Sequence, residues 1–64
     1  LPKSKDDAAF KADQIVKRLT PCSPEDRIAW FRVEKNAALH AAITAQLGPE
    51  HDKVKAIAKL WQEE

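Results

Sequence analysis

The hydrophobic positions in the first third of the chain recur at helical spacing. Alanine and aliphatic residues return every three or four positions along one side, at Ala8, Ala12, Ile15, Val16 and Leu19. Such a stripe is typical of an amphipathic helix with one buried face. Ser4 offers an N-cap hydroxyl, and Thr20-Pro21 ends the helix because a residue before proline is disfavoured in helical geometry. The pattern predicts a helix at about residues 5–19.

A long alanine-rich stretch follows, ending at Gly48, with apolar residues on nearly every side. A helix that is apolar all round is usually contacted from several directions, so we expect one central helix at about residues 24–47. At the helical rise it would be about 36 Å long. Asn36 supports a second interpretation, a break in this helix, because asparagine tolerates the left-handed conformation that ends helices.

The start of this middle helix has the strongest local signal in the chain, Ser23-Pro24-Glu25-Asp26. Serine suits the N-cap, proline suits the first helical position, and two carboxylates meet the positive end of the helix dipole. Capping accounts for all four residues, whereas an acidic catalytic or metal site would leave the serine and the proline unexplained. We therefore interpret this segment as structural.

A second amphipathic stripe lies near the C-terminus and consists of Val54, Ile57, Ala58 and Trp61, with Leu60 on its flank. It predicts a third helix at about residues 50–63, starting with Pro49-Glu50. Short connections favour antiparallel neighbours, so the expected fold is all-α, a small up-down-up three-helix bundle. We expect residues 1–64 to form one domain that belongs to a larger or processed chain.

Composition agrees with an all-α fold and narrows the partners. The chain has a single glycine, no tyrosine, and 11 basic against 10 acidic residues. This charge balance argues against coating nucleic acid or an anionic membrane, and no apolar run is long enough for a membrane span. A lone cysteine excludes an intrachain disulfide and favours a reducing compartment such as the cytoplasm.

No residue pair is a convincing catalytic couple. Cys22 precedes a helix start, which favours a reactive thiolate, but the carboxylates of Glu25 and Asp26 oppose one. A nucleophilic cysteine needs a positioned histidine, and His40 would lie about four turns further along the middle helix. His51 lacks the spacing of a zinc ligand set. We therefore expect no enzyme activity, no cofactor and no metal.

Two aromatic residues are the main candidates for partner contact. Phe10 projects away from the apolar stripe among polar residues, and Trp30 lies on the more polar half of the middle helix. Aromatic side chains are typical interface anchors, and Arg27 and Glu34 are further candidates on the same half of that helix. Alternatively, Phe10 is covered by the N-terminal segment and Trp30 belongs to the core. The preferred function is a non-enzymatic protein–protein interaction module.

Two other functions remain as alternatives. The four-residue turn between the first two helices is loosely like that of a helix-turn-helix DNA-binding domain. Yet this turn lacks glycine, and Glu25-Asp26 would face the phosphates, so nucleic acid is not favoured. The other alternative is a self-assembling structural domain, in which the uncovered surface of the middle helix contacts a second copy.

The run Leu19-Thr-Pro-Cys-Ser-Pro-Glu-Asp-Arg-Ile-Ala-Trp-Phe has a P-x-x-P-E motif before a Trp-Phe helix. It resembles a segment of the Gag capsid domains of Ty3/gypsy-type retroelements, as does the later pair Ile43-Thr44. This resemblance implies a capsid-like self-assembling helical domain. The Trp-Phe-Arg helix is also similar to the small theta subunit of bacterial DNA polymerase III. No functional residue is transferred from either family.

Overall fold

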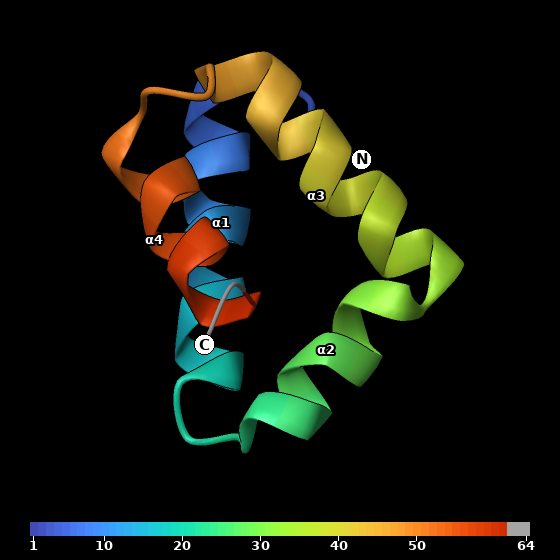
Figure 1. The fold of residues 1–64 in the computed structure, drawn as a ribbon. Helices are drawn as coiled ribbons and strands as arrows, with labels where there is room; N and C mark the ends of the chain where they lie inside the picture. The colour runs from blue at the N-terminus through green and yellow to red at the C-terminus, as the bar shows by residue number, and fades with distance from the viewer. Residues whose placement is uncertain (62–64) are drawn as a thin grey trace.

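The computed structural model describes residues 1–61, and this part of the chain is helical with no strand. Its four helices are α1 (Lys5–Leu19), α2 (Pro24–Arg32), α3 (Glu34–Leu47) and α4 (Asp52–Trp61) (Figure 1). The all-α prediction is confirmed, but the count of three helices is wrong, because the predicted middle helix is two helices. The predicted end of the last helix at residue 63 lies outside the described residues.

Helix α1 has the predicted bounds, and side chains close both of its ends. The Ser4 hydroxyl accepts a hydrogen bond from the Asp7 amide at 3.1 Å, and the Asp7 carboxylate accepts one from the Lys3 amide at 3.0 Å. The bond from Lys3 is the main reason that the pKa of Asp7 is lowered. At the other end, Thr20 donates its hydroxyl to the Val16 carbonyl at 2.6 Å. Both ends therefore agree with the capping chemistry of the sequence.

The middle segment bends at Val33, so the preferred prediction of one continuous helix is wrong, and the alternative of a break near Asn36 is close to the observed structure. Val33 is extended (φ −68°, ψ 127°) and is both the last cap of α2 and the N-cap of α3. The break comes three residues before Asn36 and uses no left-handed residue. The Asn36 side-chain amide instead donates to the Trp30 carbonyl at 3.0 Å, replacing a bond that the break removes from α2.

The last helix starts at Asp52, two residues later than predicted. Gly48 has φ +94°, and the His51 amide donates to the Gly48 carbonyl at 3.1 Å, which closes a tight turn with Pro49 at its second position. Proline favours that turn position, so Pro49 serves the turn and not the first turn of the helix. The His51 ring nitrogen Nδ1 then accepts from the Lys53 amide at 3.1 Å and caps α4.

The buried core lies between α1, α3 and α4. It consists of the buried residues Ala8, Ala12, Ile15, Leu19, Ile43, Val54, Ile57 and Leu60. The two predicted stripes supply six of these eight residues, and Leu60 on the flank of the second stripe is a seventh. In contrast, α2 supplies none and α3 supplies only Ile43. The expectation of a central middle helix is therefore wrong.

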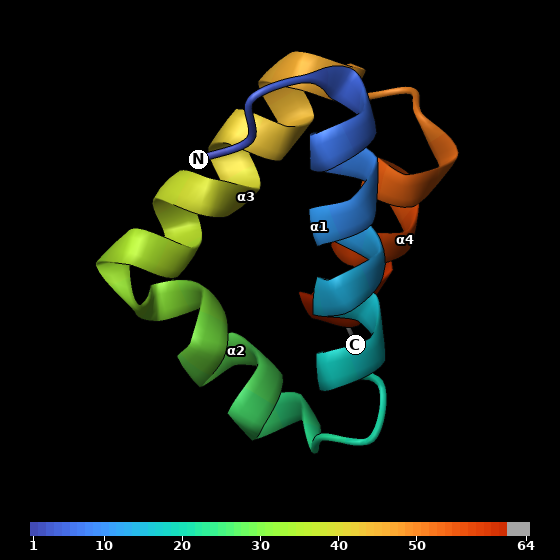
Figure 2. The same cartoon turned by 180° about the vertical axis from the view of Figure 1, so that it is seen from behind.

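The bend at Val33 explains this arrangement, because it turns the middle of the chain into an arc around α1 and α4. Figures 1 and 2 show α2 and α3 running on in the same general direction around the bend, with α1 and α4 side by side within the arc. The up-down-up order of a three-helix bundle is kept. Open space remains on the inner side of the bend, between α1 and the junction of α2 and α3.

Candidate binding groove

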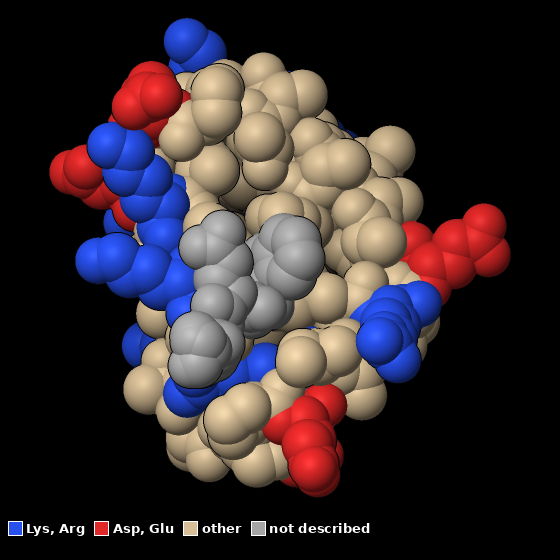
Figure 3. Space-filling model, viewed as in Figure 1, with Lys and Arg blue, Asp and Glu red and all other residues tan. Residues whose placement is uncertain are grey.

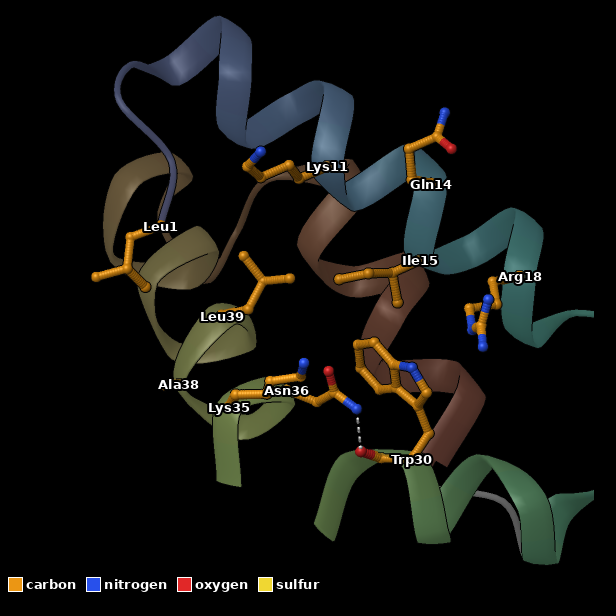
Figure 4. A pocket seen from close by; sticks show the side chains of 10 residues that line it. All are labelled: Leu1, Lys11, Gln14, Ile15, Arg18, Trp30, Lys35, Asn36, Ala38 and Leu39. Atoms are coloured by element: carbon orange, nitrogen blue, oxygen red, sulfur yellow. Dashed lines mark hydrogen bonds between the residues drawn. The ribbon is translucent and has the colours of Figure 1, made fainter. Parts of the chain in front are cut away.

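An open groove of about 700 Å³ lies between α1 and the bend that joins α2 to α3. Figure 4 shows its walls, with α1 on one side and the end of α2 and the start of α3 on the other. Its lining residues are Leu1, Lys11, Gln14, Ile15, Arg18, Trp30, Lys35, Asn36, Ala38 and Leu39. Ligand sites are concave and mostly apolar with a few polar groups, and this groove has that composition.

One wall is a single face of α1. Lys11, Gln14, Ile15 and Arg18 stand at positions i, i+3, i+4 and i+7, and such residues share one side of a helix. They span two turns, or about 10 Å along the axis. Ile15 is a buried core residue, so it forms the apolar base of this wall, while the three polar side chains stand along it.

Trp30 dominates the opposite wall. It is half-buried and packs against the core, and its indole extends from α2 toward Ile15 (Figure 4). The Phe31 ring meets it edge-on with centroids 5.0 Å apart. Asn36 holds the Trp30 carbonyl, so the same hydrogen bond that stabilises the bend also fixes the backbone from which the indole projects. These contacts hold the Trp30 indole in place as an aromatic surface of the groove.

Among residues 1–61, the charged residues that line the groove are all cationic. Lys11 forms an ion pair with Asp7 at 3.6 Å. Arg18 and Lys35 stand on opposite walls, and neither forms an ion pair with another of residues 1–61. The Arg18 carbonyl accepts a long hydrogen bond from the Cys22 thiol at 3.4 Å, which does not involve the guanidinium. The groove thus combines an apolar base with two cations that form no ion pair among residues 1–61.

The structure places three of the four predicted contact residues in separate environments. Trp30 lines the groove, but Phe10 is 60% exposed in another pocket, between α1 and α4, beside the ion pair of Lys53 and Asp13 at 2.7 Å. Glu34 is exposed in the first turn of α3, where the helix dipole favours a carboxylate. Phe10 and Trp30 therefore do not line one common pocket.

Arg27, the fourth predicted contact residue, is bound within the chain. Its guanidinium donates from Nε to the Leu19 carbonyl at 2.9 Å and from Nη2 to the Thr20 carbonyl at 2.7 Å. These carbonyls belong to the end of α1, where helix carbonyls have no partner within the helix. Arg27 therefore ties the start of α2 to the end of α1.

A third pocket lies on α2 and α3 and is lined by Ile28, Phe31, Arg32, Ala37 and His40. The Phe31 and His40 rings meet with centroids 5.4 Å apart. Burial lowers the pKa of His40 below the usual histidine value of 6.5, because the charged imidazolium loses water there. Among residues 1–61, the residues that line this pocket include one cation, Arg32, and no Asp or Glu.

Three further observations limit the assignment. Comparisons with protein-family models, with curated proteins and with solved structures found no match. Among residues 1–61, no three His, Cys, Asp or Glu side chains are grouped so as to hold a metal ion. None of the helices in this same range is long and apolar enough to cross a membrane. The function must therefore be argued from the geometry of the groove.

Sequence reasoning identified Trp30 but missed the other groove residues. The α1 face with Lys11, Gln14 and Arg18 has helical spacing that a sequence shows, but charged residues on one helix face are ordinarily just solvated. Lys35 and Leu39 reach the groove because the chain bends at Val33. These residues could be assigned to the groove only from the position of the bend, and neither the prolines nor the glycine of the sequence mark that position.

Proposed function

We propose that this chain is a non-enzymatic protein–protein interaction module that binds a partner segment in the groove between α1 and the α2–α3 bend. The observation that carries the proposal is Trp30, a half-buried aromatic side chain exposed to an open concavity. Binding hot spots are enriched in tryptophan and lie in pockets from which a partner excludes water. Leu39 and Ile15 extend the apolar surface on either side of the indole.

The size of the groove suggests the kind of segment it binds. Its α1 wall is two helical turns long, so a partner helix of about two to three turns would contact it along its whole length. Gln14 and Asn36 stand on opposite walls and supply amide groups for hydrogen bonds. This arrangement resembles the helix-in-groove mode of recognition, with apolar anchors at the base and polar groups at the rim.

The test compares two variants of α3 that carry the same alanine-to-arginine substitution at different positions. Ala38 lines the groove, whereas Ala41 is exposed on the same helix and lines none of the three pockets. Random peptides of about twelve residues, long enough for three helical turns, are selected on the wild-type chain by display and then synthesised. Ala38→Arg fills the groove mouth and should weaken their binding at least about tenfold, which is roughly 1.4 kcal/mol. Ala41→Arg should leave the affinity within about twofold.

Circular dichroism of both variants checks that they fold, since each replaces one exposed alanine by a good helix former. If selection gives no specific peptide, or if Ala38→Arg binds as tightly as the wild type, the groove is not the binding site. A loss of affinity in Ala41→Arg alone would move the site to the outer face of α3.

A second candidate function is self-association through α3. No charged residue occurs between Lys35 and Glu50, and Figure 3 shows a largely uncharged surface over α3. Four alanines on this helix are exposed: Ala37, Ala38, Ala41 and Ala45. Sedimentation equilibrium tests this candidate, because Ala41→Arg should turn a dimer into a monomer. A wild-type chain that stays monomeric at high concentration excludes it.

A further inference from the structure

We infer that the groove selects an acidic partner, namely a protein segment whose large apolar side chain is flanked by Asp or Glu. This inference rests on the proposed function and adds the chemical class of the partner. It is carried by charge, because the lining residues in the described range 1–61 include three cations and no carboxylate. The whole chain has a formal net charge of only +1, so the lining is not a sample of an overall basic surface.

The two cations without an ion pair among residues 1–61 lie on opposite walls. Arg18 comes from the last turn of α1 and Lys35 from the first turn of α3, so an acidic segment between the walls can meet both. Neither side chain makes a hydrogen bond within residues 1–61 that a ligand would have to break. Arginine also binds carboxylates through two parallel hydrogen bonds, which gives directional recognition.

The positions along α1 set the spacing of the partner's charges. Lys11 and Arg18 are seven residues apart on the same face, or about 10 Å. Two carboxylates seven residues apart on a partner helix have the same separation, and an apolar residue between them faces the same side. The apolar residue would contact Trp30 and Leu39 while the carboxylates face Lys11 and Arg18.

The groove suits a peptide better than a fatty acid. A fatty acid has one carboxylate and needs an enclosed apolar channel, whereas this concavity is open and has cations on both walls. The amide side chains of Gln14 and Asn36 can bond peptide groups but gain nothing from an acyl chain. Electrostatic complementarity of this kind adds specificity and faster association more than raw affinity.

The first measurement is the composition of the peptides selected by display on the wild-type chain. We expect Asp and Glu to be enriched beside a large apolar residue. The second measurement is the affinity of the strongest such peptide, synthesised, for the double variant Arg18→Gln/Lys35→Gln. Exposed charge pairs are individually weak, so the loss should be about fivefold to tenfold for the two together.

A matched double variant, Lys17→Gln/Lys59→Gln, removes the same charge from exposed positions outside the groove. Its affinity should stay within about twofold of the wild type. Raising the salt from about 50 mM to about 500 mM should weaken the wild type more than Arg18→Gln/Lys35→Gln, because salt screens exposed charges.

Several results would overturn the inference while leaving the interaction module intact. One such result is that the selected peptides are neutral or basic. Another is that both double variants lose the same affinity. In each case Ala38→Arg would still prevent binding. Dodecanoate displacing the peptide at a lower concentration than the peptide's own Kd would show that the groove binds fatty acids. If binding instead survives Ala38→Arg, the groove itself is wrong, and the proposed function fails together with the inference.

Discussion

Replacement of Arg27 by methionine should be among the most damaging surface substitutions in this protein. Methionine keeps most of the aliphatic length of the side chain but removes both hydrogen bonds to the end of α1. The Thr20 carbonyl then depends on water, and the Leu19 carbonyl keeps only the bond from the Cys22 amide at 3.0 Å. The contact between the start of α2 and the end of α1 is therefore weakened. The reasoning therefore predicts a loss of stability without a loss of helix propensity.

The magnitude follows from the surroundings of the two bonds. A hydrogen bond from a charged donor contributes about 1.5–3 kcal/mol, and the partly buried bond to the Leu19 carbonyl falls in this range. The bond to the Thr20 carbonyl is exposed and adds at most about 1 kcal/mol. We expect a total of about 2 kcal/mol, which is a large share of the roughly 3–10 kcal/mol that holds a domain of this length folded.

The assay is urea unfolding followed by circular dichroism, together with the thermal midpoint. Arg27→Met should lower Tm by about 8–16 °C, and Arg27→Lys should lie between it and the wild type, because an ammonium cannot reproduce the forked geometry. Arg32→Met is the control, since Arg32 is exposed and its side chain makes no hydrogen bond with residues 1–61, and its effect should stay within about 0.5 kcal/mol. Equal effects of Arg27→Met and Arg32→Met would refute the reasoning.

Two further predictions concern the bend and its neighbouring histidine. Val33→Ser should stabilise the fold by about 1 kcal/mol, because Val33 has N-cap geometry without a side-chain acceptor. A Val33→Ala control that is as stable as Val33→Ser would contradict this. The lowered pKa of His40 means that the unfolded chain binds the proton more readily. Stability should therefore fall as the pH drops through about 6.5. His40→Gln should lose less Tm than the wild type between about pH 7.5 and 5, and equal losses would exclude His40 as the cause.

Local patterns determined most of the helix ends. The cap at Ser4 and the stop at Thr20 are both present, and the Ser23 hydroxyl accepts from the Asp26 amide at 3.2 Å as the Ser23-Pro24 signature predicts. Such caps depend on side chains within three or four residues, so sequence neighbours carry the information. The start of α4 was missed because Pro49 suits both a helix start and a tight turn, and only the hydrogen bond from His51 to Gly48 distinguishes them.

The sequence by itself determined the helical class, the ends of α1 and the two stripes that, with the flanking Leu60, supply seven of the eight core residues. Periodicity reports which residues share a face, and a stripe that is apolar on one side has a single way to be buried. The segment at residues 24–47 is apolar on several sides, so its pattern does not choose a face. Packing against α1 and α4 determines which face is buried, and the residue of this segment that becomes fully buried is Ile43.

The tertiary structure alone decided where this middle segment bends and, with it, the groove. At the bend, the Asn36 side chain donates a hydrogen bond to the Trp30 carbonyl. The stability that this bond adds depends in turn on the packing of Trp30 against the core. Arg18 and Lys35 lie 17 positions apart and become opposite walls through that bend. A site built from two helices that meet at an angle leaves no regular spacing of residues in the sequence, because its geometry is set by the contact between the helices.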